Sequence, residues 1–202
     1  DAAGNESASF GDNVVLDTQA PILTGAGLTI AQGDSHTSQR QVTLEFTVTG
    51  ATQLRIRNGS SSFGAYQSLP ANNQTVWTLA ALSSSVPDGE TKTVVVQYRD
   101  AAGNETAEAS ATIVLDSVAP ETRTAELDSG AQYTNNRSVT FNIAPSISGA
   151  NLSVVLGGDI AEAATYGIGA EPSQLTLSDS DGVKAVTVVL IDQAGHLMLC
   201  DF

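Results

Sequence analysis

The stretch VVVQYRDAAGN, residues 94–104, contains the two features that decide the fold. Its first half is rich in the β-branched and aromatic residues favoured in strands, and it ends in Gly and Asn, which favour tight turns. The sequence DAAGNE at 100–105 also opens the chain at 1–6, and the two copies align without a gap over 21 positions, twelve of them identical. A weaker third copy, DQAGH, begins at Asp192. Successive copies lie 99 and 92 residues apart, so the repeating unit is about one small domain long.

Between these copies the sequence is strand-like. Residues 42–48 alternate apolar and polar side chains, and residues 138–143 repeat the alternation, as is typical of strands with one buried face. Clusters of Gly, Asn, Ser and Pro separate the other short apolar segments. These further expected strands are 54–56, 76–79, 94–98 and 112–115 in the first unit and 152–156, 175–177 and 186–191 in the second. About seven short strands in roughly 95 residues indicate an all-β chain built from immunoglobulin-like sandwiches.

The repeat also predicts the domain organisation: two tandem immunoglobulin-like β-sandwich domains preceded by an extra N-terminal strand. Residues 1–16 would be the C-terminal strand of a preceding repeat, or a donor strand. Residues 17–116 would form the first domain and residues 117–202 the second, whose last strand is short or missing. The linkers at 17–21 and 116–120 each end in Pro, which restricts the backbone and cannot donate to a sheet.

The charge balance excludes several classes of partner. The 202 residues include 8 Lys and Arg against 22 Asp and Glu, a net charge of −14. No basic footprint for nucleic acid is available, and an anionic membrane surface is disfavoured for the same reason. The longest largely apolar run, 185–191, is too short to span a bilayer, so no membrane insertion is expected. The chain opens on Asp without a leader segment, which predicts a processed product or an excised piece.

Residue types that carry catalysis are scarce. The one cysteine, Cys200, excludes an intrachain disulfide and a zinc site with two thiolates. His36 and His196 have no catalytic motif around them, and the sequence contains no GxSxG, HExxH, P-loop or GxGxxG. We therefore do not expect an enzyme.

The segments 94–104, 113–116 and 119–120 together resemble the tandem immunoglobulin-like repeats of large secreted and cell-surface prokaryotic proteins, including adhesin stalks. The resemblance implies that residues 94–104 form a strand followed by a turn. It also implies that the next strand ends in the motif L-D-x-x-A-P, where the following domain begins. The second unit departs from the pattern, with His196 in place of the Asn and Leu190 in place of Tyr98. The resemblance implies an extracellular or cell-surface location and a structural role.

Carboxylates and amides gather at both ends of the repeat, and hard cations prefer such oxygens. The resemblance to adhesin stalks implies calcium at the joints between domains. The candidate ligands are Asp17, Asp100, Asn104 and Asp116, with Asp1 and Asn5 as the earlier copy. The alternative is that Asp and Asn cap their own turn while Gly supplies a positive φ. A second Asp-rich segment, residues 179–182, is better explained as an ordinary tight turn because the later ligands of a calcium loop are missing.

Three functions follow for a chain of this kind. The favoured one is a non-catalytic spacer or stalk whose partners are neighbouring immunoglobulin-like repeats, with calcium stiffening the joints. The second is a filament subunit in which the leading strand, 8–16, completes the open sandwich of an identical chain. The third is a module that binds a surface receptor or glycan. Such a module needs exposed aromatic side chains, whereas alternation places Trp77 or a neighbour in the core.

Overall fold

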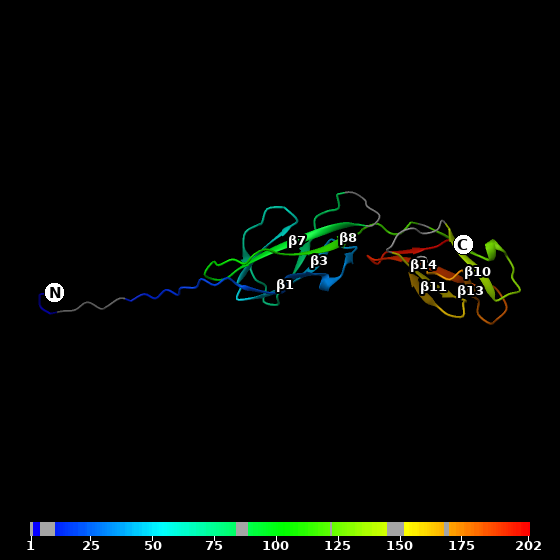
Figure 1. Cartoon of the computed structure of the whole chain (residues 1–202), viewed down its shortest axis with the longest axis horizontal. Helices are drawn as coiled ribbons and strands as arrows, with labels where there is room; N and C mark the ends of the chain where they lie inside the picture. Colours follow the sequence, from blue (N-terminus) through cyan, green and yellow to red (C-terminus); the bar gives the residue numbers. More distant parts are fainter. Residues whose placement is uncertain (1, 5–10, 84–88, 122, 145–151, 168–169) are drawn as a thin grey trace.

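The computed structural model describes residues 2–4, 11–83, 89–121, 123–144, 152–167 and 170–202. Its described residues form two β-sandwiches that follow one another along the long axis of the molecule (Figure 1), and each has its own hydrophobic core. We call the sandwich of β1 to β8 the first unit and that of β9 to β15 the second unit. No helix in the described part of the chain has the length and apolar character needed to cross a membrane.

The first unit packs a three-stranded sheet against a five-stranded sheet. The smaller sheet has the order β1-β3-β6, and the larger has the order β2-β8-β7-β4-β5. The bounds are β1 Ile22–Ile30, β3 Gln41–Thr49 and β6 Gln74–Thr78, with β2 His36–Thr37, β8 Ala109–Leu115, β7 Glu90–Arg99, β4 Gln53–Asn58 and β5 Gln67–Ser68. All pairs are antiparallel except β2 with β8, which run parallel and pair His36 with Val114 and Thr37 with Leu115.

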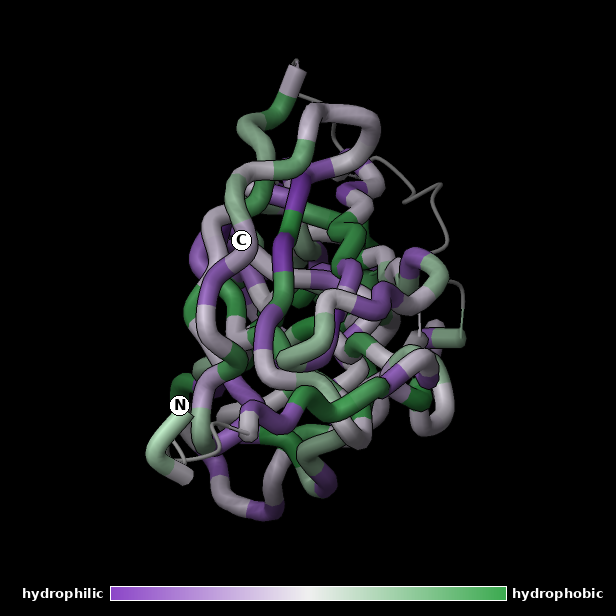
Figure 2. The backbone as a smooth tube through the Cα atoms, turned by 90° about the vertical axis from the view of Figure 1, so that its left-hand side faces the viewer, coloured by the Kyte–Doolittle hydropathy of each residue, from purple (hydrophilic) through white to green (hydrophobic). Residues whose placement is uncertain are grey.

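The period-two pattern of β3 explains the first core. Val42, Leu44 and Phe46 are buried between the sheets while the intervening side chains are more exposed. Figure 2 shows hydrophobic and hydrophilic residues interleaved along the backbone. Tyr98 on β7 is fully buried, meets Phe46 edge-to-face at a centroid distance of 6.1 Å, and donates its hydroxyl to the carbonyl of Gly27 at 2.5 Å. A buried hydroxyl needs such a partner, so this bond ties β7 to β1 across the sandwich.

The second unit is a smaller version of the same arrangement. Its sheets have the orders β13-β10-β9 and β12-β11-β14-β15. The bounds are β9 Thr124–Leu127, β10 Ser138–Ala144, β13 Gln174–Thr176, β11 Leu152–Gly158, β12 Ala164–Gly167, β14 Val186–Asp192 and β15 Leu197–Leu199. Leu190 occupies the position of Tyr98 and is fully buried. The last strand, expected to be short or missing, is the three-residue β15.

Local details repeat more faithfully than the sequence. A short 3₁₀ turn follows the first strand of each unit, η1 at Ala31–Gly33 and η2 at Asp128–Gly130, and each has a central residue with positive φ. Arg40 donates from Nε and Nη2 to the carbonyl of Leu79, and Arg137 does the same to Leu177. Two guanidinium groups thus satisfy equivalent carbonyls at equivalent sandwich edges.

Residues 11–16 of the expected N-terminal strand are not paired in a sheet of this chain, so their pairing with a neighbouring repeat or an identical chain stays a prediction. Residues 11–20 are exposed and belong to no strand, and residues 8–10 lie outside the described part of the chain. A strand needs a partner for its backbone hydrogen bonds, and no described segment pairs with this one. Val14, Val15 and Leu16 are therefore 94%, 88% and 86% exposed. Trp77, in contrast, packs against the first core as predicted and donates Nε1 to Asn58 Oδ1 at 2.9 Å.

Candidate functional site

The turn between β7 and β8 is closed by the side chain of Asp100. Its Oδ1 accepts the main-chain N–H groups of Gly103 at 2.8 Å and Asn104 at 2.9 Å, and its Oδ2 accepts Asn104 Nδ2 at 2.9 Å. The amide of Asn104, together with these main-chain donors, holds the pKa of Asp100 below its ordinary value. The turn-capping alternative for Asp100 is therefore observed directly.

The turn between β14 and β15 repeats this geometry with one substitution. Asp192 Oδ1 accepts the main-chain N–H of His196 at 2.9 Å, and Asp192 Oδ2 lies 2.8 Å from His196 Nδ1. The backbone bond that closes each turn is also the same, because Asp192 donates to the carbonyl of His196 at 3.2 Å as Asp100 does to Asn104. An imidazole nitrogen thus takes the place of an amide nitrogen.

A second Asp begins each linker. Asp17 Oδ1 accepts the N–H of Gln19 at 3.0 Å, and Asp116 Oδ1 accepts the N–H of Val118 at 2.9 Å. Both are Asx turns, in which a carboxylate fixes the backbone two residues later. Gly89, with φ +74°, lies against Asp116, and a Cβ there would be 2.9 Å from the Asp116 Cβ. A side chain at position 89 would consequently displace the linker.

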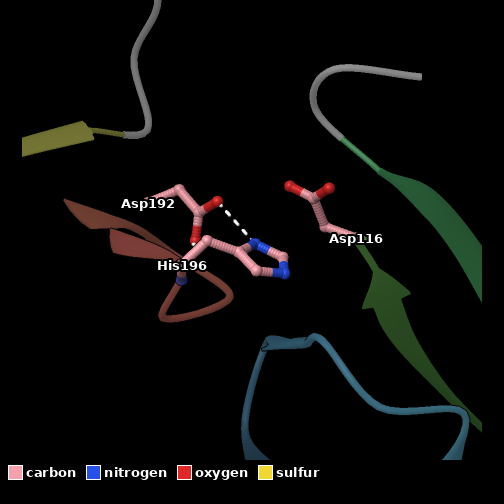
Figure 3. Close-up of side chains that lie close together, drawn as sticks. All are labelled: Asp116, Asp192 and His196. Carbon is pink, nitrogen blue, oxygen red and sulfur yellow. Dashed lines mark hydrogen bonds and ion pairs between the residues drawn. The ribbon is translucent and has the colours of Figure 1, made fainter. Parts of the chain in front are cut away.

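Turn and linker meet in two joints. In the first joint, formed by Asp17, Asp100 and Asn104, the amide Nδ2 of Asn104 also donates to the carbonyl of Asp17 at 3.1 Å. In the second joint, formed by Asp116, Asp192 and His196, one ligand atom from each side chain lies within 4.8 Å of the others. Figure 3 shows Asp116 facing the Asp192–His196 pair across the space between the units. Each joint therefore combines the Asp that begins a linker with the Asp-capped turn of the unit that follows that linker.

The structure brings together part of the predicted ligand set. Asp17, Asp100 and Asn104 meet in the first joint, whereas Asp116 lies at the opposite end of β7 and β8 and belongs to the second. Asp1 and Asn5 lie outside the described residues. Calcium binding by this set remains a prediction.

Two members of the second joint were missed by sequence reasoning. Asp192 and His196 were visible as the third copy of the repeat, DQAGH, and aligning that copy with Asp100 and Asn104 would have nominated both. In the Asp-rich segment 179–182, Asp179 forms an ion pair with Arg137 and Gly182 has a positive φ of 124°. This geometry agrees with the turn that the sequence predicted.

A further cluster was missed entirely. On the outer face of the larger sheet of the first unit, Arg55 lies over the rings of Phe63 and Tyr66 at 4.8 and 4.6 Å, and Arg99 lies over Tyr66 at 4.1 Å. Arg57 also lies 4.8 Å from the centroid of the Phe63 ring and forms an ion pair with Glu108, which directly precedes β8. Stacked and paired guanidinium groups of this kind cover a sheet face and offer little free charge to a ligand.

The second unit has one shallow hollow, of about 350 Å³, among the cavities found in the described residues. It is lined by Ile160, Ala161, Glu162, Tyr166, Pro172, Gln174, Leu175 and Thr176. A single half-buried tyrosine ring faces a mixed polar and apolar wall there. Sugar platforms need several exposed rings on one face, so the hollow does not form one.

No protein-family model matches the sequence, and no curated protein is similar enough to be matched. Among solved structures, fibronectin(III)-like modules of Clostridium thermocellum CbhA are similar to this chain with a TM-score of 0.52 and 12% identity, over 86% of this chain and 91% of theirs. The FN1–FN3 domains of chicken CNTN1 are similar with a TM-score of 0.42 and 13% identity, over 86% of this chain and 64% of that one. SGBP-B, from a mixed-linkage glucan utilization locus of Bacteroides ovatus, was solved with a mixed-linkage heptasaccharide. It is similar with a TM-score of 0.29 and 14% identity, over 96% of this chain and 47% of that one.

Only the similarity to the CbhA modules, with a TM-score of 0.52, is high enough to compare folds. At 12% identity it shows a shared fold and nothing further. It extends over both units, as tandem repetition requires. The chain consists of tandem immunoglobulin- or fibronectin-like β-sandwich repeats.

Proposed function

We propose that this chain is a non-catalytic spacer of an extracellular or cell-surface prokaryotic protein, in which successive sandwiches are held in a fixed relation by their joints. The observation that carries the proposal is that one joint design is built twice. In each, an Asx turn at the start of the linker meets an Asp-capped turn of the next unit. A chain that needed only flexible connection would have no reason to repeat these contacts.

Linker composition supports the same role. Each linker is short, begins with the Asx turn and ends at Pro21 or Pro120, so few backbone torsions are free between units. The net charge of −14 makes neighbouring chains repel each other and opposes collapse of an array. These properties suit a protein that holds another element at a distance.

The spacer proposal is tested by the tumbling of the two units in the whole chain. Backbone ¹⁵N relaxation should give both units one common rotational correlation time and an elongated diffusion tensor. A variant with a flexible Gly-Ser insertion between Asp116 and Pro120 is the control and should give two shorter, separate times. Independent tumbling in the unmodified chain would refute the fixed joint, and specific binding on a glycan array would favour the binding-module alternative.

Calcium at the first joint is part of the proposal. The carbonyl of Asp17 and the carboxylate of Asp100 both accept from Asn104 Nδ2, so flipping that amide would present Oδ1 to the same space as a third oxygen. Water would supply the remaining ligands that Ca²⁺ requires. The test is size-exclusion light scattering with millimolar calcium and after chelation. If the hydrodynamic radius does not change on chelation, the calcium proposal is rejected and the spacer proposal is unaffected.

A second candidate, the donor-strand filament subunit, is favoured by one observation. The exposed residues Val14 and Leu16 align with Ile113 and Leu115 of β8, which are 2% and 1% exposed in the first core. The leading segment therefore has the apolar pattern of a strand that completes a sandwich. The same light-scattering experiment tests it, because strand exchange gives high-mass species that a Leu16→Asp variant should not form, whereas a spacer stays monomeric.

A further inference from the structure

We propose that the second joint is a binding site for one divalent transition-metal ion, of the Zn²⁺ or Co²⁺ type. The ligands are one imidazole nitrogen of His196 and one carboxylate oxygen from each of Asp116 and Asp192. The proposal goes beyond the spacer role, which it rests on, because it assigns a metal ion and its ligands to the second joint. It also differs from the calcium prediction in its metal class.

The ligand set selects the metal. Calcium takes six to eight oxygens, whereas an imidazole nitrogen suits zinc, copper, nickel and cobalt. Zinc accepts mixed nitrogen and carboxylate ligands in a four-coordinate site that water can complete. Three protein ligands with one nitrogen therefore fit this class better than a hard cation.

The distances are close to those of a formed site. Ligand atoms about 2.1 Å from a tetrahedral zinc lie roughly 3.4 Å apart, and the three atoms here lie within 4.8 Å of one another. His196 Nδ1 and Asp192 Oδ2 are 2.8 Å apart, at hydrogen-bond distance. The ring tautomer with its proton on Nε2 frees the Nδ1 lone pair for a cation, which would replace that hydrogen bond. Asp116 closes the site through rotation of its side chain.

Burial and charge give an independent reason for a cation. Asp116 is only 4% exposed, and the Asp192 side chain is 9% exposed. Two carboxylates held close together out of water repel unless something neutralises them. Asp116 Oδ1 accepts the N–H of Val118, which leaves the other carboxylate oxygen as the one that can turn toward a cation. Figure 3 shows this carboxylate beside the Asp192–His196 pair, with no dashed line joining it to either residue.

The first joint supplies an internal control. Its Asn104 has an amide nitrogen, which has no free lone pair for a metal, and that nitrogen links the two sides by donating to Asp17. Among the described residues of the second joint, no hydrogen bond runs from Asp192 or His196 to the Asp116 linker. Replacing Asn by His therefore removes a cross-joint hydrogen bond and introduces a metal ligand at the same point.

The experiment uses the untagged whole chain with Zn²⁺ in calorimetry and Co²⁺ in visible spectroscopy. One ion should bind per chain, with the intense visible bands of tetrahedral Co²⁺. His196→Asn restores the residue of the first joint, preserves the acceptor at Asp192, and should weaken Zn²⁺ binding at least about 100-fold, more than loss of an outer-shell partner does. His36→Gln removes the other histidine, which bonds Ser35, and should change nothing.

Two further variants keep the proposal falsifiable if His196→Asn fails to fold. Asp116→Asn keeps an acceptor for the Val118 N–H but removes the charge, and should also weaken Zn²⁺ binding at least about tenfold. Asn104→His should add a second Zn²⁺ ion at the first joint. Binding that is unchanged in His196→Asn and Asp116→Asn, or the absence of any stoichiometric ion in the unmodified chain, would overturn the proposal.

Discussion

The two units have the same fold and turn geometry but are stabilised differently. The first unit contains a buried tyrosine bonded across the sandwich, a buried lysine and a layer of arginines over aromatic rings. The second replaces Tyr98 with Leu190, and its lysine, Lys184, is only half-buried. The fold therefore depends on the apolar alternation that both units share, and the polar contacts are additions that one unit has and the other does without.

The largest expected effect comes from Tyr98→Leu, which gives the first unit the residue type that the second unit has at the equivalent position. This removes a fully buried ring and leaves the Gly27 carbonyl without its donor, so we expect a loss of about 2–4 kcal/mol in unfolding free energy. Hydrogen exchange of the β3 and β7 amides measures it. Tyr98→Phe, which removes only the hydroxyl, should lose about 1 kcal/mol. Equal losses in the two variants would show that the ring itself contributes nothing.

The next largest effect on stability concerns the two lysines, Lys92 in the first unit and Lys184 in the second. Lys92 is 5% exposed, donates to the carbonyl of Ala81 at 2.7 Å and pairs with Glu90 at 2.8 Å. Lys92→Met should lower the unfolding free energy by about 1–3 kcal/mol because the carbonyl of Ala81 loses its hydrogen-bond donor. In the described part of the chain Lys184 bonds the hydroxyls of Ser178 and Ser180, so Lys184→Met should change stability by less than about 0.5 kcal/mol. Urea denaturation compares them, and equal effects would contradict the difference in burial.

The arginine layer should have a smaller effect. Arg55→Ala removes two ring contacts and should destabilise the first unit by about 1 kcal/mol. Arg55→Lys keeps the charge but loses the flat stacking surface, so it should recover less than half of that loss. Thermal unfolding of both variants measures this, and full recovery by Lys would mean that charge alone matters.

The smallest expected effects are the pH responses of two carboxylates in the first unit. Hydrogen bonds from Lys92 and Ser83 lower the pKa of Glu90 to about 2, and those from Asn104 lower the pKa of Asp100. A lowered folded-state pKa gives stability that is present above the ordinary carboxyl range, near pH 4, and is lost as pH falls through the folded value. Thermal midpoints between pH 6 and pH 2 should fall less steeply in Glu90→Gln and Asp100→Asn. Parallel curves for the unmodified chain and both variants would contradict the shifts.

The sequence was sufficient for the sandwiches because their cores are periodic. The alternation around Leu44 and Phe46 fixes which side of the strand is buried, and the repeat assigns equivalent roles to Asp100 and Asp192. What could not be predicted depends on chain segments that return from a distance. The contact of Arg55 with Phe63 and Tyr66 exists because the segment after β4 folds back over the sheet, and no local pattern encodes that path.

The joints show the same division. Turn capping by Asp100 could be derived from residue types alone, since Asp, Gly and Asn close such turns. The meeting of Asp116 with His196 could not, because it depends on how two separately folded units approach each other. The strand expected at 8–16 stays a prediction for a related reason, since strand pairing requires a partner that the sequence pattern of one segment does not identify.

The parallel pairing of β2 with β8 has a mechanical consequence. Val114 and Asp116 donate to the carbonyls of Ser35 and Thr37, each at 3.0 Å, beside the point where the chain leaves the first unit. In the second unit Thr124, the first residue of β9, forms a parallel bridge with Asp201 near the C-terminus. When the ends of a unit are pulled apart, bonds between parallel strands are loaded in shear and must break together. Each sandwich thus places a clamp where tension on the chain enters or leaves it.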